Sequence, residues 1–171
     1  MGVEFVVRPM EAHEWEHLRA IRLRALTEAP DAFITTHDEA AANPDDVWRE
    51  RAVTASLGEE QLTVLAFRNG VPVGMAVGLW RDRNGHPVVP VVGVFVAGEA
   101  RRLGVGRALM TSIEAWAFGR GAGALSLWVV DDNHGARALY KSLGFRETSD
   151  RKAINVGRPR WETRFEKLPP I

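Results

Sequence analysis

The chain has 171 residues, a length typical of one domain with a substantial core, so we expect a single domain over residues 1–171. Its 22 basic and 22 acidic residues cancel, which gives no support for nucleic acid or an anionic membrane as a partner. The absence of cysteine excludes disulfides, thiolate catalysis and cysteine metal ligands. No apolar stretch reaches membrane-spanning length and no secretion or myristoylation signal is present, so we expect a cytoplasmic protein.

The first third of the chain predicts one strand and two helices. A short strand over residues 5–8 is stopped by Pro9. Apolar residues at helical spacing predict an amphipathic helix over about 11–28. Asn43-Pro44-Asp45-Asp46 is typical of a helix start with Asn43 as the N-cap, and this second helix is expected to end near Gly58.

The first predicted helix contains His13-Glu14-Trp15-Glu16-His17, a literal H-E-x-x-H. On a helix this pattern places two imidazoles one turn apart beside a glutamate, as in zinc peptidases, so a zinc peptidase is one hypothesis. Only twelve residues precede His13, too few for the sheet and cleft that such enzymes build first, and no third ligand is marked. Both histidines fall opposite the apolar stripe of the helix, so we expect them in solvent and predict no metal site.

The middle of the chain predicts three strands joined by two tight turns. Residues 61–67 and 71–80 flank Asn69-Gly70, the favoured two-residue hairpin turn. Asn84-Gly85 offers a second turn before an apolar strand over 88–96. Pro90 removes one ladder bond from that strand, so we expect a bulge or an edge position there.

A glycine-rich turn, Arg101-Arg102-Leu103-Gly104-Val105-Gly106, follows this strand and leads into a helix over 105–118. The first amides of a helix lack intrahelical partners and carry partial positive charge, so this arrangement is typical of a phosphate site. Each interior glycine costs a helix about 0.5–1 kcal/mol relative to alanine, which indicates a close approach to the backbone at Gly104 and Gly106. The dinucleotide and nucleoside-triphosphate patterns fail, since Leu109 replaces a third glycine and Arg107 follows Gly106.

A second buried strand, residues 125–130, precedes a helix that runs from Asn133 toward Gly144. Asn133 is a good N-cap and Gly144 a good C′ residue for that helix. Tyr140 is the only tyrosine of the chain, and it lies two turns from Asn133 on the same helical face.

The two patterns together, R-x-x-G-x-G and then N-x-x-A-x-x-x-Y-x-x-x-G-F, resemble the signatures of the GNAT superfamily of acyl-CoA-dependent N-acetyltransferases. The predicted order β-α-α-β-β-β-α-β-α-β-β matches that fold over essentially the whole chain. The resemblance implies an α/β (α+β) fold with a mixed, mostly antiparallel sheet of about seven strands and four helices. It also implies a parallel central pair of strands that splays apart to admit the pantetheine arm of acetyl-CoA.

The same resemblance implies transfer of an acetyl group from acetyl-CoA to a primary amine in a ternary complex, without a metal. Tyr140 is the implied general acid, because a phenol with a pKa near 10 can protonate a leaving thiolate. An acetyl-cysteine intermediate is excluded because the chain has no cysteine. The residues expected to bind the cofactor are Val94, Phe95, Val96, Arg101, Arg102, Leu103, Gly104, Val105, Gly106, Arg107 and Asn133.

Several roles stay open at this point. The strand over 88–96 contains no carboxylate, so the general base is Glu39, Asp82, His86 or Asp131, or a chain of ordered waters. Arg137 and Lys141 either meet the ribose phosphate or form a solvated face. The residues expected to select the substrate are Phe33 and Glu39, with Trp48 either joining them or packing between helices.

The acceptor is expected to be the amine of a small molecule, with a protein N-terminus or lysine as the alternative. A non-catalytic acyl-CoA-binding module on the same fold is a further alternative, which a positioned acid at Tyr140 disfavours. Family members commonly dimerise through their C-terminal strands, so the resemblance allows a homodimer.

Overall fold

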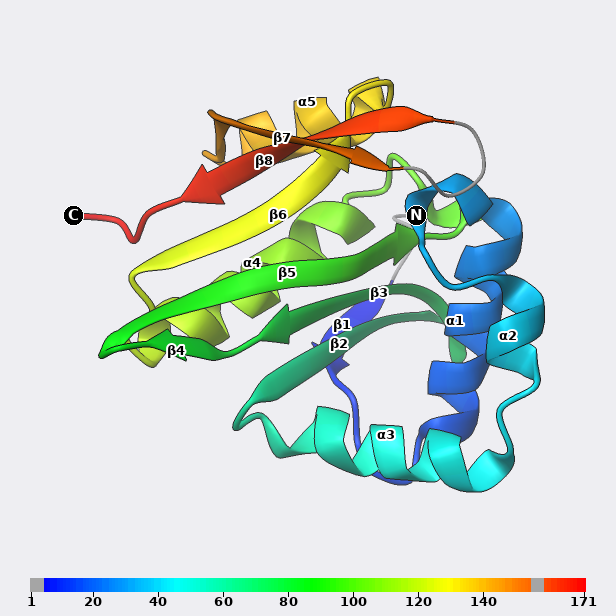
Figure 1. Cartoon of the computed structure of the whole chain (residues 1–171). Helices are drawn as coiled ribbons and strands as arrows, with labels where there is room; N and C mark the ends of the chain where they lie inside the picture. The colour runs from blue at the N-terminus through cyan, green and yellow to red at the C-terminus, as the bar shows by residue number, and fades with distance from the viewer. Residues whose placement is uncertain (1–4, 155–158) are drawn as a thin grey trace.

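The computed structural model describes residues 5–154 and 159–171, and one twisted β-sheet forms its centre (Figure 1). The strands are β1 (Val6–Pro9), β2 (Gln61–Arg68), β3 (Val71–Leu79), β4 (Arg81–Arg83), β5 (His86–Val96), β6 (Ala124–Val130), β7 (Arg146–Ile154) and β8 (Arg160–Lys167). Their order is β1-β2-β3-β5-β6-β8-β7, with the short β4 paired to β5. Only β5 and β6 run parallel among the described pairs, so the mixed, mostly antiparallel α/β fold is confirmed.

Helices cover both faces of the sheet. They are α1 (Trp15–Glu28), α2 (His37–Ala41), α3 (Asp45–Leu57), α4 (Val105–Gly119) and α5 (His134–Ser142). Side chains of β3 alternate between the faces. A Cβ atom at Gly74 or Gly78 would meet side chains of α4, whereas Met75 and Val77 line a cavity with residues of α1 and α3. Hence α4 packs on one face, and α1 and α3 pack on the other. Within the described ranges, no helix is long and apolar enough to span a membrane.

The sequence missed two short elements and misplaced two helix starts. β4 and α2 were not predicted, because three and five residues are too few for a periodic pattern. α1 begins at Trp15 rather than near residue 11, since the Glu14 carboxylate accepts a 2.8 Å hydrogen bond from the Glu11 amide and holds a turn there. The N-cap prediction for Asn43 is wrong, because its side chain donates to the Ala40 carbonyl at the end of α2 and α3 starts behind Pro44 without a side-chain cap.

The two predicted Asn-Gly turns are confirmed by their backbone angles. Asn69 and Gly70 have φ of 51° and 75°, and Asn84 and Gly85 have φ of 56° and 80°. Two successive residues with positive φ form the type I′ turn that suits the twist of antiparallel strands. After Phe145 the sequence also predicts a short strand, a loop through Gly157-Arg158-Pro159 and a final strand, and this loop lies largely outside the described residues.

The parallel pair separates at Pro90. The register between β5 and β6 joins Val88–Ala124, Val89–Leu125 and Pro90–Ser126, and beyond these residues the two strands no longer pair with each other. The expected edge position for Pro90 is wrong, because β5 lies between β3 and β6. The bulge lies beyond Pro90: the β3–β5 register shifts near Gly93, whose φ is 61°. The expected splay is therefore confirmed, and it begins where a residue without an N–H interrupts the ladder.

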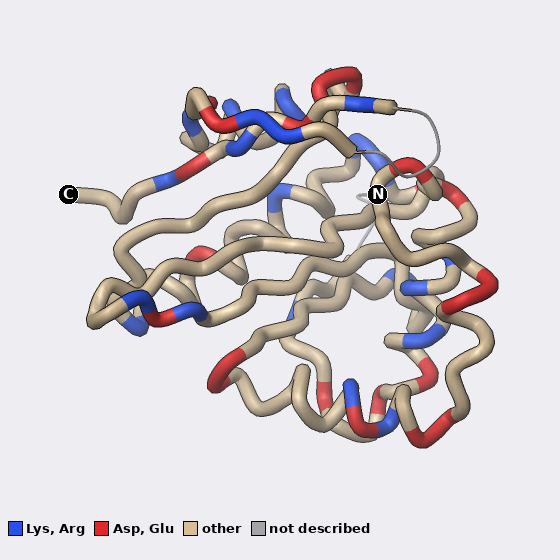
Figure 2. The backbone as a smooth tube through the Cα atoms, viewed as in Figure 1, with Lys and Arg blue, Asp and Glu red and all other residues tan. Residues whose placement is uncertain are grey.

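No charged residue occurs in β3, β5 or β6 (Figure 2). Any charged group near these three strands must therefore come from another strand of the sheet or from an element packed against it.

Candidate active site

A row of unpaired amides surrounds the start of α4. Arg102 and Gly104 have φ of 63° and 88°, and these left-handed residues turn the chain into the helix. The first amide of this region with a backbone acceptor is that of Ala108, which bonds the Gly104 carbonyl at 3.0 Å. Between Arg101, whose amide bonds the Gly98 carbonyl at 3.3 Å, and Ala108, the amides of residues 102–107 have no acceptor in the described part of the chain. Such a row of N–H groups at the positive end of a helix dipole suits an anionic phosphate.

The two glycines of this turn have different structural reasons. A Cβ at Gly104 would meet nothing within 4 Å, so its left-handed backbone is what favours glycine there. A Cβ at Gly106 would lie 3.0 Å from Cδ2 of Leu139 in α5. The close approach that the sequence predicts therefore exists at Gly106, and a neighbouring helix makes it.

Ion pairs with α1 hold the turn in place. Arg24 donates to Glu28 at 2.6 Å and to Glu99 at 2.5 Å, and Glu28 accepts from the Gly98 amide at 3.1 Å. Arg101 donates from Nε to the Val96 carbonyl at 3.0 Å, so one N–H of its guanidinium group is already bonded to the backbone.

A cavity of about 710 Å³ opens over these amides. Nearly all the residues predicted to bind the cofactor line it, together with Tyr140. They are Val94, Phe95, Val96, Arg101, Arg102, Gly104, Val105, Gly106, Arg107 and Asn133. The exception is Leu103, which is 37% exposed and lies outside this set. The side chain of Arg107 also donates to Ser142 at 2.9 Å.

Tyr140 is fixed by the end of α5. The Phe145 amide bonds the Tyr140 carbonyl and the Gly144 amide bonds the Lys141 carbonyl, each at 3.0 Å, which is the Schellman arrangement, and Gly144 has φ of 88°. The Phe145 ring meets the Tyr140 ring edge to face at 5.8 Å. Tyr140 is 6% exposed, and no described group bonds its hydroxyl. Burial raises the pKa of Tyr140 above its usual value of 10.0, so the phenol keeps its proton at neutral pH.

Asn133 begins α5 as predicted, since its side chain accepts from the Ala136 amide at 3.1 Å. It lines the 710 Å³ cavity and also a smaller one in the wedge between β5 and β6. Tyr140 and Val94 line both cavities as well. The wedge therefore continues the cavity over the α4 amides toward the other face of the sheet.

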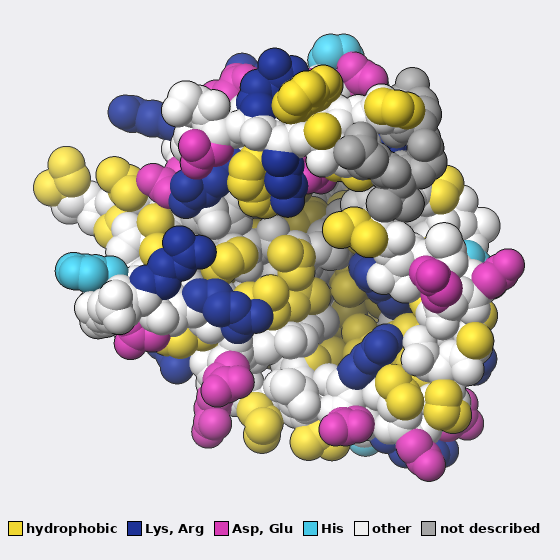
Figure 3. Space-filling view, in the orientation of Figure 1, with side chains coloured by type: hydrophobic (Ala, Val, Ile, Leu, Met, Phe, Trp, Pro, Cys, Tyr) yellow, Lys and Arg dark blue, Asp and Glu magenta, His cyan; other side chains and the backbone are white. Residues whose placement is uncertain are grey.

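A third cavity, of about 640 Å³, lies on the face covered by α1 and α3, and Figure 3 shows this hollow with an apolar floor and basic side chains at its margin. It shares Phe33, Gly93 and Trp128 with the wedge. Phe33 thus lies where a substrate-selecting residue is expected, and buried Trp48 lines the same cavity. Glu39 does not join them, because its carboxylate accepts from the Thr36 amide and closes the capping box of α2.

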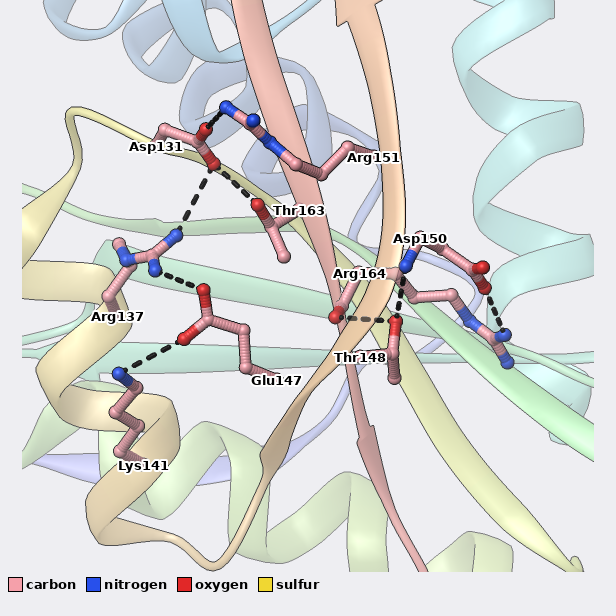
Figure 4. A network of polar contacts seen from close by, with 9 residues as sticks. All are labelled: Asp131, Arg137, Lys141, Glu147, Thr148, Asp150, Arg151, Thr163 and Arg164. Atoms are coloured by element: carbon pink, nitrogen blue, oxygen red, sulfur yellow. Dashed lines mark hydrogen bonds and ion pairs between the residues drawn. The ribbon is translucent and has the colours of Figure 1, made fainter.

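None of the four predicted base candidates lines the wedge. Glu39 caps α2, Asp82 accepts from the Gly85 amide in the β4–β5 turn, and His86 is exposed at the start of β5. Asp131 belongs to a polar network at α5, β7 and β8 (Figure 4). A hydrogen bond from Thr163 lowers the pKa of Asp131, with help from Arg151 and Arg137, so it is a weak proton acceptor.

The same network engages the two cations considered for the ribose phosphate. Arg137 pairs with Asp131 at 3.3 Å and with Glu147 at 2.5 Å, and Lys141 pairs with Glu147 at 3.1 Å. Both side chains therefore join α5 to Glu147 of β7 through ion pairs.

Glu162 is the carboxylate that the sequence did not single out. It lines both the wedge and the 640 Å³ cavity, its side chain is 16% exposed, and Lys152 lies 3.4 Å away. The register Val130–Glu162 brings it there from a distant part of the chain. No local pattern marks this glutamate, because only strand pairing places it at the splay.

The H-E-x-x-H segment does not form the helical zinc pattern. His13 precedes α1 and its side chain is 77% exposed, as predicted, whereas His17 is half covered, its ring 5.3 Å from that of Phe67. Arg8 binds the buried Glu14 carboxylate at 2.7 Å, and this hydrogen bond lowers the pKa of Glu14 to about 2. Glu14 therefore anchors β1 to the start of α1. In the described ranges, no three His, Asp or Glu side chains are grouped to hold a metal.

Comparisons with known proteins agree with this geometry. The family model for acetyltransferases of the GNAT family matches residues 15–145. Aminoglycoside N(6′)-acetyltransferase type 1 of Salmonella enteritidis is 24% identical over 147 residues, which cover 83% of this chain and 92% of the relative.

Solved structures with the same fold include an acetyltransferase of the GNAT family from Streptococcus pneumoniae. It has a TM-score of 0.84 at 22% identity and covers 97% of this chain and 100% of its own. The structure of yncA from Salmonella typhimurium with its cofactor acetyl-CoA has a TM-score of 0.78 at 19% identity, over 96% and 93% of the two chains. The fold implied by the sequence is thereby confirmed.

Proposed function

The chain belongs to the GNAT family of acetyltransferases, and from this premise we propose that it transfers the acetyl group of acetyl-CoA to a primary amine of a small molecule by direct attack in a ternary complex. One observation carries the proposal: the unpaired amides of residues 102–107 and the unbonded hydroxyl of Tyr140 border the same cavity. The amides can donate hydrogen bonds to a diphosphate, and the hydroxyl can donate a proton to a leaving sulfur.

The residues that line the cavity support acetyl-CoA as its ligand. The amides at the start of α4 would hold the diphosphate, and the side chain of Arg102, which has no partner in the described ranges, adds positive charge. Beyond Pro90 the β6-facing backbone of β5 has no strand partner, so it is free to bond the amides of the pantetheine. When bound there, acetyl-CoA supplies an activated acyl group whose leaving group is a thiolate.

Two protons move in the reaction, and the site has a group for each. As the carbon–nitrogen bond forms and the carbon–sulfur bond breaks, Tyr140 donates its proton to the leaving sulfur. Glu162 accepts the proton that the attacking amine loses, and exchange with solvent then restores both groups. Its place at the junction of the wedge and the 640 Å³ cavity supports this role. Geometry of this kind comes before pKa in choosing a base.

The acceptor enters from the face of the sheet opposite α4. A cavity of about 640 Å³ is within the ordinary range for small-molecule sites, which supports a small-molecule amine. The name of the Salmonella enteritidis relative also indicates a small-molecule amine, and at 24% identity it supports that class rather than an individual acceptor.

The test is acetyl-CoA binding by calorimetry together with amine-dependent release of CoA. In Gly106→Val, the added side chain would cover the amides and press on Leu139, so we expect the Kd for acetyl-CoA to rise about tenfold or more. Gly119→Ala is the control, because a Cβ there meets nothing within 4 Å, and it should bind like the wild type. Absence of heat with acetyl-CoA in the wild-type protein would contradict the proposal.

A further inference from the structure

Two arginines line the 640 Å³ cavity, which we call the acceptor cavity, without an acidic partner in the described ranges. Arg22 of α1 and Arg51 of α3 both line it, and neither makes an ion pair within the described ranges. Arginines two residues away on the same helices behave differently. Arg24 bonds Glu28 at 2.6 Å, and Arg49 bonds Asp46 at 2.8 Å. Arg24 and Arg49, which lie outside the cavity, thus have acidic partners, whereas the two arginines that line the cavity have none in the described ranges.

Aromatic rings hold both guanidinium groups in place. Arg22 lies 4.5 Å above the Phe33 ring, and Arg51 lies 5.1 Å from the centre of the Trp48 ring. An arginine on an aromatic face keeps its in-plane N–H donors, and a fork of such donors matches the oxygens of a carboxylate or phosphate. Burial and the like charge of Arg51 lower the pKa of Arg22. A negatively charged group bound between the two guanidinium groups would relieve this repulsion.

The remaining charges of the cavity cancel. Lys152 and Glu162 lie 3.4 Å apart, and among the described residues no other acidic side chain lines this cavity. The described lining of the cavity therefore carries two uncompensated positive charges, those of Arg22 and Arg51. A polycation such as an aminoglycoside would be repelled there, whereas an anion would be attracted.

The positions of the charges also give the cavity a direction. Glu162 lines both the cavity and the wedge, whereas Arg22 and Arg51 line the cavity alone. A bound molecule with a positive end and a negative end would accordingly place its amine toward the wedge and its negative group toward α1 and α3.

We infer that the acceptor is an amine that also carries an oxyanion, such as an amino acid, and that Arg22 and Arg51 bind this oxyanion while the amine faces the wedge. The inference rests on the proposed function and narrows its substrate class. The oxyanion is a carboxylate or a phosphonate, which offer the same oxygens to a guanidinium fork.

The experiment compares matched amines. L-Amino acids, their carboxamides, aminoalkyl phosphonates and the aminoglycoside kanamycin are offered with acetyl-CoA, and CoA release gives kcat and KM for each. We expect the anionic amines to exceed their neutral carboxamides by about tenfold or more in kcat/KM, the effect of one charged hydrogen bond. The carboxylate and phosphonate arms show which oxyanion is preferred.

Variants of the arginines separate binding from folding. Arg51→Gln, at an exposed position, should remove most of this preference by raising KM for the anionic amines, with kcat nearly unchanged. Arg22→Gln should act in the same direction. Arg49→Gln is the matched control on α3, because its guanidinium faces Asp46 outside the cavity, and it should keep the full preference.

Three results would overturn the inference: carboxamides used as well as acids, kanamycin as the preferred acceptor, or a preference that survives in both Arg22→Gln and Arg51→Gln. If acetyl-CoA binds and no amine is acetylated, the proposed function fails instead. The inference is then decided by calorimetry of N-acetyl amino acids with the CoA-bound protein. Binding that Arg51→Gln abolishes supports it, and absence of binding overturns it.

Discussion

Replacing Tyr140 by phenylalanine isolates the proposed acid step. The substitution removes one hydroxyl and keeps the ring in its 6% exposed position against Phe145, at 5.8 Å. Because no described group bonds that hydroxyl, the free energy of unfolding should change by less than about 1 kcal/mol. Loss of a positioned general acid lowers a rate by roughly 10²- to 10⁴-fold, or about 3–5 kcal/mol of barrier, and we expect kcat to fall within that range.

Steady-state CoA release gives kcat for Tyr140→Phe, and calorimetry gives its affinity for CoA, which should stay near that of the wild type. The acid works in its protonated form, and burial raises the pKa of Tyr140, so loss of its proton is moved to higher pH. The wild-type kcat should therefore show no decline due to Tyr140 up to about pH 10. An unchanged kcat, or equal losses in kcat and CoA affinity, would refute the acid role and favour a binding role.

Three further substitutions test the base, the packing and a buried charge. Glu162→Gln should lower kcat/KM about 100-fold or more without weakening acetyl-CoA binding. Glu166→Gln on the same strand is the control and should leave kcat/KM unchanged. Equal activity of the two variants would exclude Glu162 as the base. Gly78→Ala places a Cβ 2.9 Å from the Trp116 ring, so urea unfolding should show a loss of about 1–3 kcal/mol, and full stability would contradict the tight packing of α4. Glu14→Gln should cost about 3 kcal/mol at pH 7, because the folded-state pKa of about 2 lies below the usual 4.5. That contribution is present above pH 4.5 and is lost as pH falls toward 2, so the gap between wild type and variant should close in acid; a gap that is constant with pH would refute it.

The sequence was sufficient for features that depend on neighbouring residues. The Asn-Gly turns, the N-cap at Asn133 and the C′ position of Gly144 were predicted, because these motifs satisfy backbone groups within a few residues. The same holds for the unpaired amides at the start of α4, which follow from helix geometry. A single-domain architecture, a homodimer and a cytoplasmic location stay predictions.

Only the tertiary structure decided which side chains share a cavity. Glu162 reaches the wedge through strand pairing, and Arg22 and Arg51 meet because α1 packs beside α3 on one face of the sheet. Conversely, Glu39 and Asp131 were plausible bases from the sequence, but the structure shows that Thr36 engages the first and Thr163, 32 residues away, engages the second. Residues far apart in sequence are brought together by sheet order and packing, which no short pattern encodes, and the chemistry of the acceptor side depends on them.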